Sequence, residues 1–203
     1  MMTLDEAWNW YVTTEKQLSL FGRIGRRHWD NLPWDGELGK DEKLKTLTSR
    51  DLVADADFSL DHLDDFAVLI LFSAFESIIR DQARQDVQRE RGRLSHPLVT
   101  RILDQAIGDI EQSSIFRVLE VFKGQDANLV EEVNQVRQYR NWVAHGRRGK
   151  PPFGIDPEIA YKRLKRFLDQ TRPRGAEALA GEIAYKRLKR FLDRFTPPIA
   201  EEA

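Results

Sequence analysis

The sequence predicts an all-α protein, a bundle of about four to five core helices with additional helices before and after it. Apolar residues recur at helical spacing in several long segments, and glycine and proline punctuate the chain sparsely. No segment alternates apolar and polar residues as a half-buried strand does. The chain has 203 residues, of which 41% are hydrophobic and 32% charged, so it is long enough for a buried core and typical of folded proteins.

Composition and the N-terminal sequence exclude several classes of site and location. The chain has no cysteine, which excludes disulfides, thiolate metal sites and a cysteine nucleophile. Its start, MMTLDEAWNWYV, lacks the basic and apolar regions of a signal peptide. The longest apolar run, 66-FAVLILF-72, is far shorter than the ~20 residues of a transmembrane helix. We therefore expect a cytoplasmic protein that does not associate with membranes.

Three regions are expected along the chain. Residues 1–50 comprise a helix over about 4–20 and a loop-rich segment, 22–43, whose Gly, Pro, Asn and Asp residues interrupt any periodicity. Residues 51–155 comprise the helical bundle itself. Residues 156–203 comprise basic amphipathic helices.

The main core helix is predicted from about residue 59 to residue 88. At about 100° per residue, its apolar side chains fall on two faces. One face carries Leu63, Phe66, Ala67, Ile70, Ala74 and Ile78, and the other carries Val68, Phe72, Phe75 and Ile79. Apolar residues on two sides indicate a helix that is sandwiched within a bundle or shared with a partner subunit.

Later helices are predicted over 98–110, 113–122 and about 127–145. After them, the dodecamer EIAYKRLKRFLD occurs at 158–169 and again, unchanged, at 182–193. Two identical copies indicate a recent duplication or an assembly artefact, because solenoid repeats diverge and number at least three. We expect one copy to pack on the bundle and the other to form a loosely held extension.

The helix predicted over 127–145 carries a cation on its apolar face. That face comprises the apolar residues Leu129, Val133, Val136, Val143 and Ala144. Arg140 falls in their midst. Burying a guanidinium without an anionic partner is costly, so an acid is expected to meet it. Asp81, on the extension of one apolar face of the main core helix, is the first candidate for that partner, and Glu76 is the second.

Polar and basic residues gather around the same helix end, in 137-RQYRNWVAHGRRGK-150. Asn141 and His145 lie four residues apart and therefore on one side of the helix. A cation, an amide and an imidazole within one and a half turns suit the binding of a phosphate and the movement of a proton. The flanking residues Arg137, Arg147, Arg148 and Lys150 add positive charge around this helix end. The alternative is a buried Arg-Asp salt bridge next to an ordinary helix C-terminus.

Other candidate sites are weaker. The sequence contains no glycine-rich phosphate loop, no His-x-x-x-His pair and no Ser-His-Asp pattern. His28, His62 and His96 are scattered without metal-ligand spacing. The acid pair Asp64-Asp65 is interpreted as part of a solvated helix face. We therefore expect neither a metal nor a cofactor, and a net charge of -1 gives the whole chain no electrostatic attraction to nucleic acid.

The hexapeptide 140-RNWVAH-145, followed by Gly146, resembles the signature of HEPN domains: an arginine, a polar residue, three variable residues and a histidine. HEPN proteins are compact helical bundles, usually dimeric, in which this motif ends a late helix. Many are metal-independent endoribonucleases of toxin–antitoxin, anti-phage or RNA-processing systems. The resemblance covers about residues 55–146 and leaves the first 50 residues and the duplicated tail unexplained.

The resemblance implies a role for each fixed residue of the motif. His145 would act as general base on the ribose 2′-hydroxyl or as general acid on the leaving 5′-oxygen, Arg140 would bind the scissile phosphate, and Asn141 would orient the imidazole or the phosphate. The product would end in a 2′,3′-cyclic phosphate, and DNA would not be cleaved. RNA, a second copy of the chain and an antitoxin protein are the implied partners. The flanking basic residues Arg137, Arg147, Arg148 and Lys150 are then the candidate RNA contacts. The alternative is a non-catalytic HEPN bundle that acts as an RNA-binding or protein-interaction module, or as an antitoxin itself.

Overall fold

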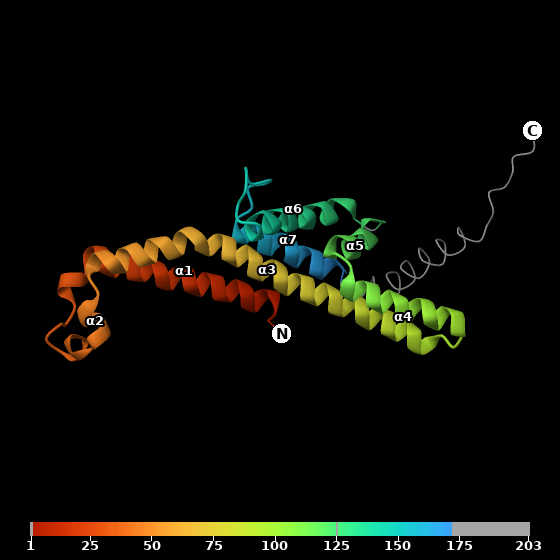
Figure 1. Cartoon of the computed structure of the whole chain (residues 1–203), viewed down its shortest axis with the longest axis horizontal. Coiled ribbons are helices and arrows are strands. Elements are labelled where there is room, and N and C mark those ends of the chain that lie inside the picture. Colours follow the sequence, from red (N-terminus) through yellow and green to blue (C-terminus); the bar gives the residue numbers. More distant parts are fainter. Residues whose placement is uncertain (1, 125, 172–203) are drawn as a thin grey trace, which may run out of the picture.

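The structure of this chain, a computed structural model, describes residues 2–124 and 126–171, and all regular secondary structure in those ranges is helical (Figure 1). The predicted all-α helical bundle is therefore confirmed. The long helices are α1 (Leu4–Arg27), α3 (Ser49–Arg93), α4 (Pro97–Gln112), α6 (Ala127–Ala144) and α7 (Pro157–Thr171). Shorter connecting helices are α2 (Glu42–Thr46), α5 (Ile115–Leu119) and the 3-10 turns η1 (Trp29–Asn31), η2 (Glu37–Lys40) and η3 (Glu120–Gly124).

Helix α3 is the axis on which the other helices pack. Its 45 residues span about 67 Å at ~1.5 Å per residue. Helix α1 runs along its first half, α6 and α7 cover its middle, and α4 lies beside its last turns (Figure 1). None of the helices within the described ranges is both long and apolar enough to cross a membrane.

Helix α1 continues past the predicted end at about residue 20 and includes two glycines that suggested a loop. Gly22 and Gly25 are buried against α3. A Cβ atom on Gly25 would lie 2.6 Å from Val53 Cγ2 and 3.1 Å from the carbonyl oxygen of Ser49. These glycines therefore serve a close approach of two helices rather than a turn, and the predicted loop begins only after Arg27.

Helix α3 begins ten residues before its predicted start, at Ser49 rather than at residue 59. A capping box fixes this start, since the Thr48 hydroxyl accepts from the backbone N–H of Asp51 and the Asp51 carboxylate accepts from the backbone N–H of Thr48. The added turns pack on the end of α1, where Ala56 is buried and Asp57 pairs with Arg26.

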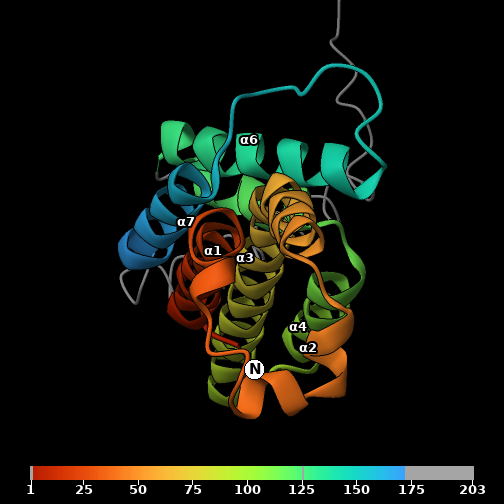
Figure 2. The ribbon, with the colours of Figure 1, turned by 90° about the vertical axis from the view of Figure 1, so that its left-hand side faces the viewer.

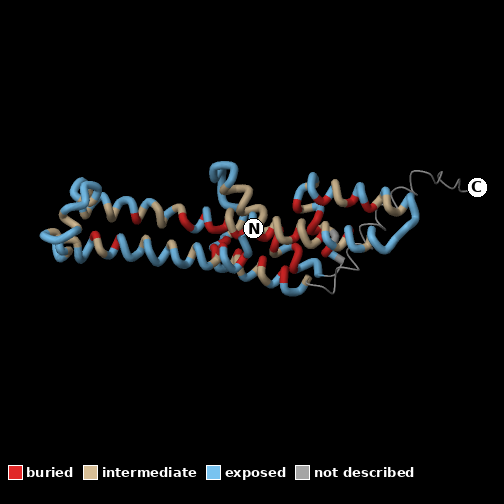
Figure 3. The backbone as a smooth tube through the Cα atoms, turned by 90° about the horizontal axis from the view of Figure 1, so that it is seen from below, coloured by how far each residue is buried: buried red, intermediate tan, exposed pale blue. Residues whose placement is uncertain are grey.

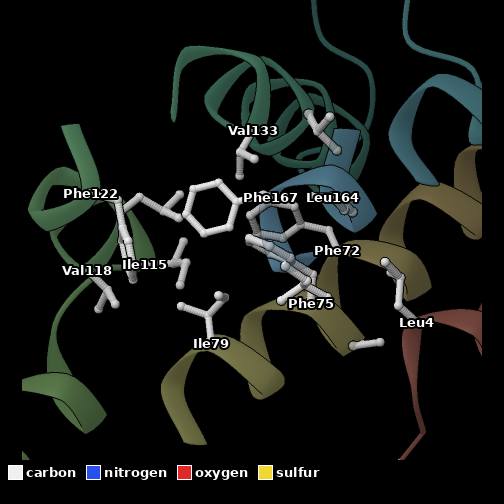
Figure 4. Packing of buried hydrophobic residues seen from close by; sticks show 14 of the residues in the cluster. Leu4, Phe72, Phe75, Ile79, Ile115, Val118, Phe122, Val133, Leu164 and Phe167 are labelled. Carbon is white, nitrogen blue, oxygen red and sulfur yellow. The ribbon is translucent and has the colours of Figure 1, made fainter. Parts of the chain in front are cut away.

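The core lies where α3, α6 and α7 meet, and buried residues concentrate there while the ends of α3 stay largely exposed (Figure 3). Phe72 and Phe75 of α3 and Phe167 of α7 have no or almost no exposed surface and pack ring against ring (Figure 4). The second predicted apolar face of α3 is thus its main core face. On the first face, Leu63, Ala67 and Ala74 are buried, whereas Phe66 is 56% exposed.

Helix α7 comprises the first copy of the repeated dodecamer. The side chains that it buries are Pro157 and, within the dodecamer, Ala160, Leu164, Phe167 and Leu168. This confirms that one copy packs on the bundle, in the same hydrophobic cluster as α3 and α6. The second copy, at 182–193, lies outside the described residues.

Candidate functional site

Helix α6, which carries the RNWVAH motif, crosses over α3 and α7 and leaves the core before its last turn (Figure 2). Its buried side chains are Leu129, Val130, Val133, Asn134 and Val136. Val143 is only half-buried and Ala144 is exposed, so the last two members of the predicted core face lie outside the core. The motif therefore lies where the helix emerges from the core, with Arg140 at the boundary.

The end of α6 is a Schellman motif built on Gly146. With His145 as the C-cap, the backbone N–H of Gly146 donates to the Val143 carbonyl at 3.0 Å, and that of Arg147 donates to the Trp142 carbonyl at 2.9 Å. Gly146 has φ 79, the left-handed conformation that this motif requires. Arg147 follows with φ 57, which costs a non-glycine residue about 1 kcal/mol. The backbone hydrogen bond from Arg147 to the Trp142 carbonyl offsets part of this cost.

Arg140 is half-buried, with 32% of its side chain exposed. Its guanidinium lies over the Phe72 ring at 5.7 Å, and its Nη1 donates to Asn141 Oδ1 at 3.1 Å. Its Nε is buried and has no hydrogen-bond partner among the described residues. The ring and the amide that contact the guanidinium at close range are both neutral groups.

The nearest acid to Arg140 is Glu76, whose Oε2 lies 4.0 Å from Arg140 Nη2. The other carboxylate oxygen of Glu76 accepts from Arg80 Nη2 at 2.7 Å, so the acid is shared between two arginines. Asp81, our first candidate, pairs instead with Arg84 at 2.7 Å, and that assignment is wrong. The reason is the crossing point, because α6 passes α3 at Phe72 and Glu76, more than one turn before Asp81.

Asn141 and His145 lie on the same helix side, as predicted, but their side chains have different surroundings. The Asn141 side chain binds Arg140 and therefore does not orient the imidazole through its oxygen. His145 is exposed, and its backbone N–H closes the last turn on the Asn141 carbonyl at 3.0 Å. The arrangement presents an accessible imidazole one helical turn beyond a part-exposed guanidinium.

A second polar cluster lies directly after the motif, around the buried carboxylate of Asp65. Only 7% of Asp65 is exposed, although the sequence suggested a solvated face. Its Oδ2 pairs with Arg147 Nη2, and its Oδ1 accepts from the Tyr139 hydroxyl at 2.7 Å. Burial and the negative charge of Asp64 raise the pKa of Tyr139, so its hydroxyl stays protonated and donates. His62 Nδ1 lies 3.5 Å from the Arg147 guanidinium.

Sequence reasoning missed Asp65, although a usable signal was present. Asp65 precedes the buried residues Val68 and Phe72 by three and seven positions, which places it on the main core face of α3. The rule that singled out Arg140 on an apolar face applies equally to this carboxylate.

The four predicted RNA contacts differ in how many interactions they make with other residues of the protein. Arg147 is occupied in part by Asp65. Arg137 donates to Asn134 Oδ1 at 2.9 Å and lies 5.2 Å from the Phe116 ring centre, so it serves the packing of α6. Arg148 and Lys150 are exposed on the segment after α6. That segment is tied back by a hydrogen bond from Trp142 Nε1 to the Gly149 carbonyl at 3.2 Å.

Within residues 2–124 and 126–171, no group of three or more His, Asp or Glu side chains is arranged to hold a metal ion. The side chains at and next to the end of α6 supply guanidinium donors, an imidazole and the buried carboxylate of Asp65. No family model, no curated protein and no solved structure matches this chain.

Proposed function

We propose that this protein is a HEPN-type endoribonuclease that cleaves RNA without a metal ion and leaves a 2′,3′-cyclic phosphate. A toxin–antitoxin or anti-phage defence role follows from the same resemblance. The proposal rests on the RNWVAH motif together with the state of Arg140, which is the observation that carries it. A guanidinium held on a phenyl ring, with its nearest acid at 4.0 Å and part of its surface exposed, retains donors for a phosphate.

The chemistry assigns one task to each side chain. The ribose 2′-oxygen attacks the adjacent phosphorus while the bond from phosphorus to the 5′-oxygen breaks, and one proton leaves the 2′-hydroxyl while another reaches the 5′-oxygen. The exposed His145 imidazole moves one of these protons. The Arg140 guanidinium binds the phosphate and stabilises its added charge in the transition state, and Asn141 keeps that guanidinium in place.

The reaction uses both a base and an acid, whereas the motif supplies one imidazole per chain. A second copy related by a two-fold axis would supply the other imidazole. We therefore propose a homodimer as the active form, with RNA as its substrate and an antitoxin protein as the partner that controls it. An active monomer, found by light scattering under assay conditions, would refute the dimer.

The decisive assay incubates purified protein with labelled total tRNA and a structured messenger fragment in EDTA. Arg140→Ala and His145→Ala are expected to abolish cleavage. Matched controls are Arg101→Ala and His28→Ala, which change exposed residues of the same types far from the motif, and both are expected to cleave as the wild type does. Cleavage that persists in both motif variants would refute the assignment of the site.

The second candidate is a non-catalytic HEPN bundle that binds RNA or a protein. The observation that favours it is the placement of Glu76 next to Arg140, because a salt bridge, even a long one, gives the arginine a structural role. Expression in cells separates the two. Growth arrest by the wild type but not by His145→Ala indicates cleavage, and equal effects indicate binding. An antitoxin would instead leave growth unchanged and rescue cells from a co-expressed toxin.

A further inference from the structure

A hollow of about 310 Å³ lies next to the end of α6. Its lining comes from one stretch of α3 and from the last turn of α6 and the segment after it: His62, Asp65, Phe66, Val143, Gly146 and Arg147. This volume is at the lower end of the range for small-molecule sites, about 300 to 1,000 Å³, and suits a single planar ring system. The function proposed above leaves this hollow without a role.

One side of the hollow is polar and preorganised. The Asp65 carboxylate is buried and has two partners, the Tyr139 hydroxyl and the Arg147 guanidinium. A carboxylate offers about four lone-pair directions, so two acceptor positions remain after these contacts. The pair also holds Arg147 in its left-handed backbone conformation, with 39% of the side chain exposed. A buried carboxylate and a part-exposed guanidinium thus lie side by side at the hollow.

The other side of the hollow is apolar. Phe66 exposes 56% of its surface there, and half-buried Val143 lies on the α6 side. One turn and two turns before Phe66 on α3 stand His62 and the 68% exposed Phe58, whose rings meet edge to face at 4.7 Å. Exposed aromatic rings next to cations are the features on which proteins stack the bases of single-stranded RNA.

These groups match one base better than the others. Guanine offers two adjacent donors, N1–H and the 2-amino group, to a carboxylate, and two adjacent acceptors, O6 and N7, to a guanidinium. Adenine, cytosine and uracil each lack at least one of these pairs. A phenyl ring such as that of Phe66 provides the stacking surface that any base requires.

We infer that this hollow is a binding site for a guanine base, which stacks on Phe66 and hydrogen-bonds to Asp65 and Arg147. The inference deepens the proposed function, on which its biological meaning rests. Gly146 and Arg147 follow His145 directly in the chain, so consecutive Cα atoms are only about 3.8 Å apart. His145 does not itself line the hollow, but its backbone directly adjoins two residues that do. On this basis the inference extends to selection of a guanosine next to the cleaved bond.

The test measures binding of free mononucleotides, which does not depend on cleavage. Calorimetry or NMR titration with guanosine, adenosine, cytidine and uridine 3′-monophosphates is expected to give at least tenfold tighter binding of the guanosine nucleotide. Phe66→Ala and Arg147→Lys are expected to remove that preference, since the lysine keeps the charge next to Asp65 but loses the fork. Phe21→Ala, a change at an exposed phenylalanine of α1 outside the hollow, is expected to leave it intact.

Two results would overturn the inference. The first is equal binding of all four nucleotides, or guanosine binding that survives Phe66→Ala. The second is a wild-type dimer that binds none of the nucleotides and that dissociates on the change Phe66→Ala. That result would mean that the exposed Phe66 ring contacts a second copy of the chain. Guanosine binding without RNA cleavage would support the guanine site and refute the nuclease activity. The two proposals can therefore fail separately.

Discussion

The guanidinium of Arg147, in the segment that follows α6, forms an ion pair with the buried carboxylate of Asp65 in the middle of α3. The pair joins the end of the motif helix to the central helix of the bundle. It also stabilises a left-handed residue directly after His145 and the Gly146 turn. The segment that directly follows His145 is therefore tied to a residue far away in the sequence.

Removing the charge of Asp65 is expected to destabilise the fold. Asp65→Asn leaves Arg147 without its anion and weakens the bond from the Tyr139 hydroxyl. Because Arg147 is partly exposed, we expect a loss of about 1 to 3 kcal/mol in the free energy of unfolding, below the cost of breaking a fully buried pair. Denaturant titration measures it. Asp61→Asn, at an exposed position one turn earlier, is the control and is expected to change stability by less than about 0.5 kcal/mol.

Glu76 is expected to matter more for stability than Asp81. Glu76 accepts from Arg80, which also donates to the Ser113 carbonyl at 2.9 Å, and it is the acid nearest to Arg140. Glu76→Gln is therefore expected to cost about 1 to 2 kcal/mol of unfolding free energy. Asp81→Asn breaks a more exposed pair with Arg84 and is expected to cost about 0.5 kcal/mol or less. Thermal and denaturant unfolding measure both variants. Equal losses of stability in the two variants would contradict this ranking.

The two glycine-to-alanine changes Gly25→Ala and Gly108→Ala are expected to have opposite signs. A Cβ atom at Gly25 meets Val53 at 2.6 Å, and the overpacking outweighs the gain in helix propensity, for a net loss of about 1 kcal/mol. At Gly108, inside α4, nothing lies within 4 Å, so alanine is expected to stabilise by up to about 1 kcal/mol. Melting temperatures of the two variants compare them directly. A stabilised Gly25→Ala would mean that α1 and α3 pack less closely than described.

The capping box at the start of α3 predicts a pH dependence. The Thr48 side chain, followed by the Thr48 backbone N–H, lowers the pKa of Asp51 below its ordinary value. A carboxyl whose pKa is lower in the folded state contributes stability above its unfolded pKa and loses it as the pH falls through the folded pKa. Thr48→Ala is expected to raise the pKa of Asp51 toward its ordinary value. A carboxyl-detected NMR titration measures this, and an unchanged pKa would show that the box does not form.

The sequence was a good guide to helices and to anomalies within them, and a poor guide to where helices cross. Arg140 was recognised as a cation on the apolar face of its helix because helical periodicity is local. Its acid was misassigned to Asp81 because periodicity gives the face of a helix and not the height at which a second helix passes. Gly25 suggested a loop because one residue type serves both turns and close helix contacts, and only the neighbour, Val53, distinguishes them.

The central claim is that the motif at the end of α6 promotes attack by the ribose 2′-hydroxyl on the adjacent phosphate. The most direct measurement maps a cleavage site in a short RNA in EDTA and then replaces the ribose on its 5′ side with 2′-deoxyribose. The account predicts that the all-RNA product ends in a 2′,3′-cyclic phosphate and that the single deoxy substitution abolishes cleavage at that bond. Cleavage of the deoxy-substituted bond, or a product with a free 3′-hydroxyl, would contradict it.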